Sequence, residues 1–145
     1  MLTEISCSLF KTANNPSDTV KFHKGLNIVL GGSRGETSIG KSTTLLIIDF
    51  AFGGLTYAHS DAVRELQDHT IKFVFEFGGK EYHFSRSTKR PELVTYHQSP
   101  TSKKDISNKE FCNWLAEQYH IKYENESFRN IISRFSEFMV KITIL

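Results

Sequence analysis

Hydrophobic and polar residues alternate most regularly between positions 71 and 77 of this chain. The apolar positions in that stretch are Ile71, Phe73, Phe75 and Phe77. A period of two is typical of a strand that buries one of its faces. The pair Gly78-Gly79 follows at once and predicts a hairpin turn. Alternation resumes through Tyr82 and Phe84, so we expect a return strand there.

Other strands are indicated by weaker patterns. Residues 2–11 alternate loosely and predict a first strand, residues 19–23 predict a second, and residues 92–97 predict a further one. Residues 98–105 are polar and contain Pro100, which favours a solvated loop over a binding patch. Twelve Phe and five Tyr in the whole chain indicate an aromatic, sheet-rich interior.

Two helical patterns follow in the last third of the chain. Ser107 and Glu110 have the spacing of a capping box at the start of a helix. The apolar stripe of that helix is Phe111, Trp114, Leu115 and Tyr119. The apolar stripe of the last helix is Phe128, Ile131, Ile132, Phe135 and Phe138. Arg129 and Arg134 are expected elsewhere on the surface of the last helix. Core packing accounts for both stripes.

A glycine-rich segment lies between residues 31 and 43. From Gly35 it reads G-x-x-x-x-G-K-S, the phosphate-binding P-loop pattern. Upstream, residues 26–30 form a short apolar run that is typical of a buried strand. Downstream, residues 42–52 run without a breaker to Gly53-Gly54, which predicts a helix and its C-terminal cap. Strand, glycine loop and helix is the setting in which this pattern binds a nucleotide. The alternative is an ordinary surface turn.

The candidate phosphate-binding residues are Gly35, Thr37, Ser38, Ile39, Gly40, Lys41, Ser42 and Thr43. Glycines let successive backbone N–H groups point at one anion, and the following helix adds the positive end of its dipole. Lys41 is expected to reach the β- and γ-phosphates, Ser42 to hold Mg²⁺, and Thr43 to contact the α-phosphate. Either Gly31 or Gly35 opens the loop. The pattern therefore predicts a nucleoside triphosphate and magnesium as ligands.

Residues 45–49 imitate the apolar run and terminal aspartate of a Walker B strand. We reject that interpretation because the run lies within the helix that must follow Lys41. Asp49 is instead expected to be a helix-face residue paired to a neighbour, and no catalytic residue is identified in the chain. Arg64 and Arg86 could approach phosphate or DNA, although exposed arginines on helices and strands are more common.

Composition and charge fit one domain, residues 1–145. The hydrophobic content of 39% and charged content of 23% are ordinary for a globular protein. A net charge of +2 is too small to indicate nucleic-acid binding. Cys7 and Cys112 lie far apart and are expected to be reduced, buried thiols. Neither a signal peptide nor a run long enough to span a bilayer is apparent, which predicts a cytoplasmic protein without a membrane partner.

An aromatic antiparallel hairpin set after a P-loop helix resembles the N-terminal lobe of ABC-type ATPase heads, particularly the chromosome-maintenance and repair group of SMC, Rad50, RecN and RecF proteins. Phe10-Lys11 and residues 24–31 look like the approach to the P-loop in those heads. The resemblance is closer still to a bacterial family known by its DUF2326 domain. That likeness rests on residues 38–43, 47–50, 53–54 and 127–135.

The resemblance implies an α/β fold with a mixed sheet, an antiparallel β meander and C-terminal helices, and it implies ATP as the nucleotide. It also implies a role in DNA maintenance, DNA repair or anti-phage defence, with DNA as a further candidate ligand. The signature motif, the Walker B pair and the switch histidine of such heads are missing from residues 1–145. We therefore expect the P-loop half of a head, which needs a C-terminal half, on the same or a separate chain, and a second head for hydrolysis.

Two other interpretations stay open. One is a small, complete P-loop kinase or GTPase, which requires a second acidic strand and a base-reading motif that are not visible. The other is a non-catalytic split or truncated module that docks onto partners through its apolar end, residues 135–145. The apolar run at residues 139–145 looks cut off rather than finished.

Overall fold

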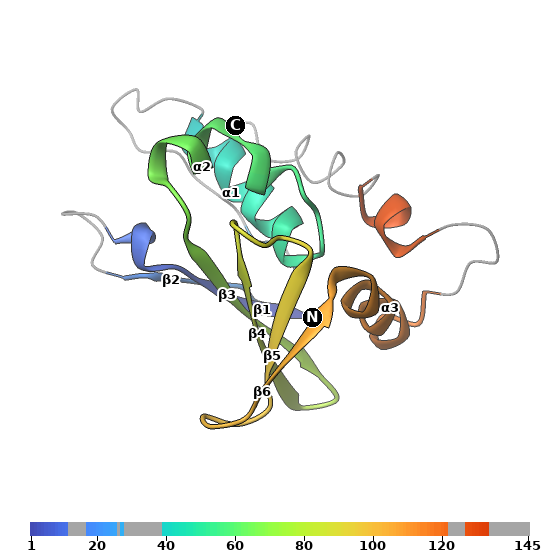
Figure 1. Cartoon of the computed structure of the whole chain (residues 1–145). Coiled ribbons are helices and arrows are strands. Elements are labelled where there is room, and N and C mark those ends of the chain that lie inside the picture. The colour runs from blue at the N-terminus through green and yellow to red at the C-terminus, as the bar shows by residue number, and fades with distance from the viewer. Residues whose placement is uncertain (12–16, 26, 28–38, 122–126, 134–145) are drawn as a thin grey trace.

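The computed structural model describes residues 1–11, 17–25, 27, 39–121 and 127–133, and for residues 39–41 it describes the backbone alone. Within these ranges the chain is a mixed α/β protein built on one antiparallel sheet (Figure 1). The predicted strand at residues 26–30 lies outside the described residues, apart from Asn27.

Six strands form the sheet in the order β2-β1-β3-β4-β5-β6, and every neighbouring pair is antiparallel. Their bounds are β1 (Leu2–Ser6), β2 (Thr19–Lys21), β3 (Thr70–Phe77), β4 (Lys80–Ser87), β5 (Leu93–His97) and β6 (Lys103–Ser107). The expected meander is present from β3 to β6. The described strands contain no parallel pair.

The helices are α1 (Ile39–Ala51), α2 (Asp61–Leu66) and α3 (Asn108–Gln118), with short 3-10 helices η1 (Ser8–Phe10) and η2 (Tyr57–His59). Residues 128–133 are also helical. The predicted helix after the glycine-rich segment is confirmed, and it begins earlier than expected, at Ile39. It ends at Ala51, and Gly53 follows with a φ of 92°, a conformation that glycine adopts without strain.

The β3–β4 hairpin has the register that the alternation predicts. Phe73 lies opposite Phe84, and Phe75 lies opposite Tyr82. Gly78 turns the chain with a φ of 58°, and Gly79 follows with a φ of 75°. The predicted turn and return strand are therefore confirmed.

The first predicted strand is shorter than expected. It ends at Ser6 rather than Lys11, because the chain turns into η1. The backbone N–H of Phe10 donates to the carbonyl of Cys7 at 3.0 Å in that turn.

The predicted loop at residues 98–105 is wrong in its second half, where Lys103 begins β6. This strand forms because its backbone pairs with β5 along its whole length. Thr95 and Asp105 lie opposite each other, and the threonine hydroxyl donates to the carboxylate at 2.6 Å. Edge strands often carry lysines in place of apolar residues, so hydrophobic alternation does not mark them.

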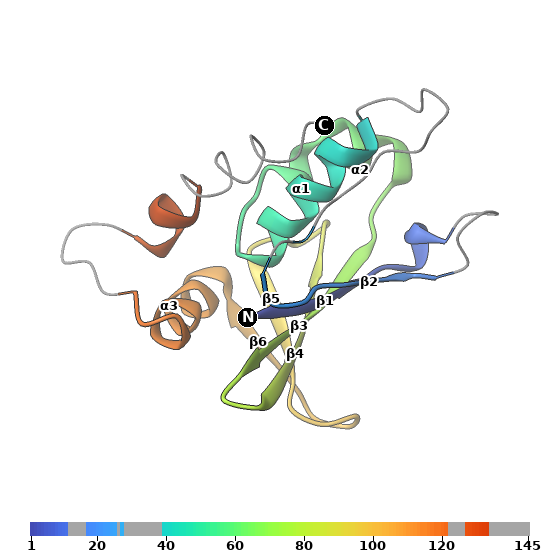
Figure 2. The same cartoon turned by 180° about the vertical axis from the view of Figure 1, so that it is seen from behind.

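One face of the sheet is covered by α1 and α3, which lie on the same side (Figure 2). The largest fully buried apolar side chains are Tyr57, Phe50, Phe73, Phe75, Phe111, Ile71, Leu115 and Val94. Aromatic rings meet closely in this layer; the Phe84 and Phe111 centroids are 5.0 Å apart. The opposite face carries polar residues such as Lys72 and His83, which are exposed. The aromatic interior and the apolar stripe of α3 are thus confirmed.

The helix α3 begins as the sequence predicts. The Ser107 hydroxyl accepts from the backbone N–H of Glu110 at 3.2 Å, and the Glu110 carboxylate accepts from the N–H of Ser107 at 2.8 Å, which completes the capping box. Phe128 is buried, and its ring stacks on Tyr119 with centroids 6.5 Å apart. Phe135 and Phe138, predicted for the last stripe, lie outside the described residues.

Candidate functional site

The glycine-rich motif runs into the first turn of α1. Gly35, Thr37 and Ser38 lie outside the described residues, and residues 39–41 supply the first helical backbone of α1. The side-chain position predicted for Lys41 is therefore among the parts that the structure does not describe. The backbone of α1 starts inside the motif, as the phosphate-binding geometry requires.

Ser42 and Thr43 lie beside a large hollow at this end of α1. Ser42 is exposed, Thr43 is half-buried, and both line a space of about 990 Å³. Its lining includes Leu9 and Phe10 from η1, and Tyr57, Asp61, Arg64 and Leu66 from η2 and α2. Ligand pockets for molecules of nucleotide size commonly span about 300–1,000 Å³, so the space is sufficient for one.

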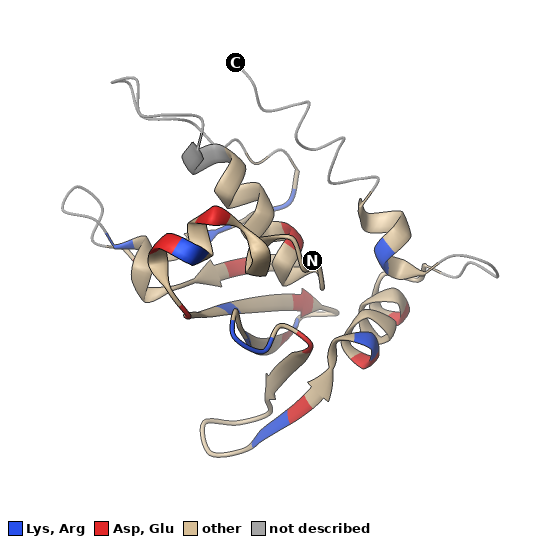
Figure 3. Cartoon of the chain, turned by 45° about the horizontal axis from the view of Figure 1, so that its top comes forward, with Lys and Arg blue, Asp and Glu red and all other residues tan. Residues whose placement is uncertain are grey.

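Both signs of charge line this hollow, along α2 (Figure 3). Arg64 donates to the Asp61 carboxylate at 2.8 Å, and both side chains are largely exposed. Glu65 adds a second carboxylate next to them. Arg64 is thus an exposed helix arginine, the more common of the two expectations, and it also borders the hollow. An exposed pair of this kind contributes little to stability and leaves the guanidinium able to exchange its partner for a ligand anion.

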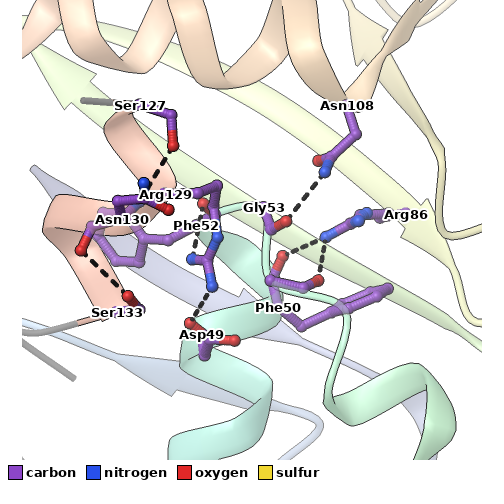
Figure 4. Close-up of polar contacts among 11 residues, drawn as sticks. Asp49, Phe50, Phe52, Gly53, Arg86, Asn108, Ser127, Arg129, Asn130 and Ser133 are labelled. Carbon is purple, nitrogen blue, oxygen red and sulfur yellow. Dashed lines mark hydrogen bonds and ion pairs between the residues drawn. The ribbon is translucent and has the colours of Figure 1, made fainter. Parts of the chain in front are cut away.

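Three side chains from elsewhere in the chain bind the C-terminal end of α1 (Figure 4). Arg86 Nη1 donates to the carbonyls of Phe50 and Gly54, each at 2.8 Å. Asn108 Nδ2 donates to the carbonyl of Gly53 at 2.9 Å. The third side chain, Arg129, belongs to the C-terminal helical segment. These bonds satisfy carbonyls that a helix end leaves without intrahelical partners.

Arg129 also forms the ion pair that was predicted in general terms for Asp49. Its Nη2 donates to Asp49 Oδ1 at 2.9 Å, and its Nη1 lies 3.4 Å from the carbonyl of Phe52. The expectation that Asp49 is a paired helix-face residue is confirmed. The guanidinium of Arg129 thus contacts the C-terminal end of α1.

The sequence predicts that Arg86 either approaches phosphate or DNA or is exposed on its strand, and the structure shows instead that it is buried. Arg86 is 1% exposed, so it does not lie on the surface. Besides the α1 carbonyls it donates through Nε to the carbonyl of Pro91 at 2.7 Å, and its guanidinium lies 4.2 Å from the centre of the Phe50 ring. Burial lowers the pKa of Arg86 from 12.5 to about 10. A sequence signal existed, since Arg86 continues the inward-facing series Tyr82 and Phe84 along β4.

Tyr57 attaches η2 to the core beside the hollow. Its ring meets Phe50 edge-on with centroids 5.6 Å apart, and burial raises the pKa of its hydroxyl to about 12. The carbonyl of Gln67 accepts from His69 Nδ1 at 2.7 Å, and in this tautomer Nε2 accepts from the Tyr57 hydroxyl at 2.8 Å. Both ring nitrogens of His69 therefore have hydrogen-bond partners.

The thiols of Cys7 and Cys112 are both buried, as expected. The described residues contain no cluster of three or more His, Cys, Asp or Glu side chains that could hold a metal. In those same ranges no helix has the length and apolarity needed to cross a membrane.

Comparisons with known proteins do not identify a relative of this chain. No family model matches it, and searches of curated proteins and of solved structures gave no match.

Proposed function

We propose that this chain is the ATP-binding N-terminal half of an ABC-type ATPase of the SMC, Rad50 and RecN kind, related to the DUF2326 family. The observation that carries the proposal is the coincidence of motif and helix: α1 begins at Ile39, inside G-x-x-x-x-G-K-S. Ser42 and Thr43, the next side chains along that helix, border a hollow large enough for a nucleotide. A surface turn requires neither feature.

Each residue of the motif contacts a different part of Mg·ATP. Backbone N–H groups of Gly35, Thr37, Ser38, Ile39 and Gly40 surround the phosphates. Lys41 neutralises the β- and γ-phosphates, Ser42 supplies a hydroxyl oxygen to Mg²⁺, and Thr43 contacts the α-phosphate. An exposed serine in the first turns of α1 fits this role, since Mg²⁺ is coordinated by oxygen and keeps several waters.

The nucleoside end of ATP then occupies the hollow. Phe10 and Leu9 offer apolar surface for the base on one side, and Arg64 and Asp61 offer polar groups on the other. Ligand sites of this type combine an apolar lining with a few polar groups that fix orientation.

Hydrolysis is assigned to a larger assembly. Transfer of the γ-phosphoryl group to water needs a group that orients the water and charge that stabilises the transition state, and this chain supplies only the binding part. We infer that a C-terminal ATPase half and a second head complete the site. The resemblance to SMC, Rad50 and RecN heads is the basis for proposing a role in DNA maintenance, DNA repair or anti-phage defence, with DNA as a candidate partner.

Lys41→Ala tests the binding step. We expect Mg·ATP affinity, measured by calorimetry on the full chain, to fall at least tenfold, because a charge-assisted contact contributes about 1.5–3 kcal/mol. Lys109→Ala is the matched control, since Lys109 is exposed on α3. Equal affinities of wild type and Lys41→Ala would reject the proposal.

Turnover separates the proposal from its alternative. Isolated chain with Mg·ATP or Mg·GTP is expected to release no phosphate above background, and addition of a C-terminal half is expected to start ATP hydrolysis. Sustained GTP hydrolysis, or phosphate transfer to an acceptor, by the chain alone would instead support a complete small P-loop enzyme.

A further inference from the structure

Gln67 ends α2 in a backbone conformation that residues other than glycine rarely adopt. Its φ is 61° and its ψ is −174°. The strain of a non-glycine residue in this region corresponds to a roughly 5- to 150-fold change in an equilibrium constant. Strain of this kind persists only where surrounding contacts hold it, and it gathers at ligand clamps and switch regions.

Residues 57–69 form a segment that contains α2, and hydrogen bonds join the two ends of this segment, which we call its base. Tyr57 lies before α2 and His69 lies after it, and the Tyr57 hydroxyl is 2.8 Å from His69 Nε2. The backbone N–H of His69 donates to Thr88 Oγ1 at 3.0 Å, which fixes this end on the sheet. These hydrogen bonds fix both ends of the segment. Gln67 connects α2 to the fixed residue His69, so the backbone strain is located at Gln67.

Few contacts hold α2 itself. Among its six residues, all of them described, Val63 alone is buried. The ion pair between Asp61 and Arg64 is internal to the helix and therefore does not attach α2 to another element. A helix with one buried side chain can move at small cost while its pinned base stays in place.

Two exposed leucines, one on α2 and one on η1, would meet if α2 moved toward η1. Leu66 at the end of α2 is 48% exposed, and Leu9 of η1 is 42% exposed. Both line the hollow of about 990 Å³ beside α1 and also a second hollow of about 460 Å³. The two leucines therefore lie between the two hollows. An approach of α2 toward η1 would narrow the larger hollow and bury both leucines.

We propose that α2 is a movable wall of the nucleotide hollow, which closes over the bound nucleoside by rotation at Gln67 and seals with Leu66 against Leu9. This inference rests on the proposed nucleotide site. The unliganded form is the open one, in which Gln67 is strained, because closure over an empty hollow would leave unfilled space between α2 and α1. Closure relieves that strain and buries the two leucines, so both terms favour the closed, liganded form and slow the release of nucleotide.

The first test changes only the strain. Gln67→Gly can adopt the open conformation without strain, whereas Gln67→Ala loses the side chain but stays strained. Without ligand, Gln67→Gly is expected to melt at a higher temperature than Gln67→Ala. In stopped-flow with a fluorescent ATP analogue and Mg²⁺, Gln67→Gly is expected to release the nucleotide at least fivefold faster than Gln67→Ala. Equal melting temperatures, or equal release rates, would overturn the inference.

The second test changes only the seal. Leu66→Ser is expected to release the same analogue about three- to tenfold faster than wild type, because roughly half a leucine side chain is no longer buried on closure. Leu55→Ser is the control, since Leu55 is 46% exposed and lines neither hollow. Equal release from the two serine variants would exclude a seal at Leu66.

The wild-type chain separates this inference from the proposed function. If wild type does not bind the analogue, the nucleotide site itself is refuted, and the wall loses its ligand. If wild type binds it and all four variants release it at the same rate, the site stands and the movable wall is refuted.

Discussion

Arg86→Met is the most informative perturbation of the fold. Arg86 is fully buried, yet its guanidinium binds carbonyl oxygens rather than a carboxylate. It joins β4 to the C-terminal end of α1, the helix whose other end carries the proposed phosphate site. Methionine has a similar length and no donor, so the substitution removes the hydrogen bonds while it keeps much of the packing.

The magnitude follows from three acceptors and one charge. Loss of the guanidinium leaves the carbonyls of Gly54 and Pro91 without this donor, at a cost of about 1–3 kcal/mol each. The carbonyl of Phe50 still accepts from the N–H of Gly53 at 3.1 Å, so its lost bond costs about 0.5–1.5 kcal/mol. The contact with the Phe50 ring adds about 1–2 kcal/mol. Burial of the charge opposes these terms: the lowered pKa, about 10 against 12.5, corresponds to about 3 kcal/mol. We expect Arg86→Met to lower the free energy of unfolding by about 1–6 kcal/mol.

Urea unfolding followed by tryptophan fluorescence measures this difference. Trp114 is the one tryptophan of the chain, and its ring packs 5.0 Å from Phe84 in the core. The control is Arg64→Met, which removes an exposed arginine and is expected to change the free energy of unfolding by less than about 0.5 kcal/mol. If Arg86→Met and Arg64→Met unfold at the same urea concentration with unchanged slope, the reasoning about buried carbonyls is refuted.

Three smaller perturbations test separate parts of the fold by urea unfolding. Gly53→Ala is expected to lower the free energy of unfolding by about 2–3 kcal/mol, because Gly53 has a φ of 92° and an added Cβ would lie 2.5 Å from Cys112 Sγ. Gly78→Ala, whose added Cβ would lie in open space, should lower it clearly less. Ser107→Ala removes the capping box and should cost about 1 kcal/mol; no change would contradict the cap. Burial raises the pKa of Tyr57 to about 12, so the stability that its proton contributes is complete below pH 10 and is lost as pH rises toward 12. Tyr57→Phe should flatten that alkaline decline relative to wild type, and an equally steep decline would show that Tyr57 does not cause it.

Several elements could be predicted because their signals are local. The β3–β4 hairpin needs only alternation and the turn at Gly78-Gly79, and the start of α3 needs only the capping pair. The helix after the glycine-rich motif was predicted for the same reason, and so was its end before Gly53. Each signal spans a few residues, and the backbone energies that it reflects depend little on distant parts of the chain.

The remainder depended on contacts between distant segments. β6 forms because β5 offers a partner, although its own residues read as a polar loop. The partner of Asp49 is Arg129, 80 residues away, and no sequence pattern near either residue indicates this pairing.

The sequence by itself determined the strand periods, the helix caps and the presence of a phosphate-binding pattern, since these follow from steric and hydrogen-bonding preferences within a few residues. Only the tertiary structure decided that Arg86 is enclosed by carbonyls at the end of α1, and that η1 and α2 border a common hollow beside Ser42. The physical reason is that burial and enclosure are properties of surfaces brought together by the whole chain, and the free energy of a polar group depends on which of those surfaces meets it.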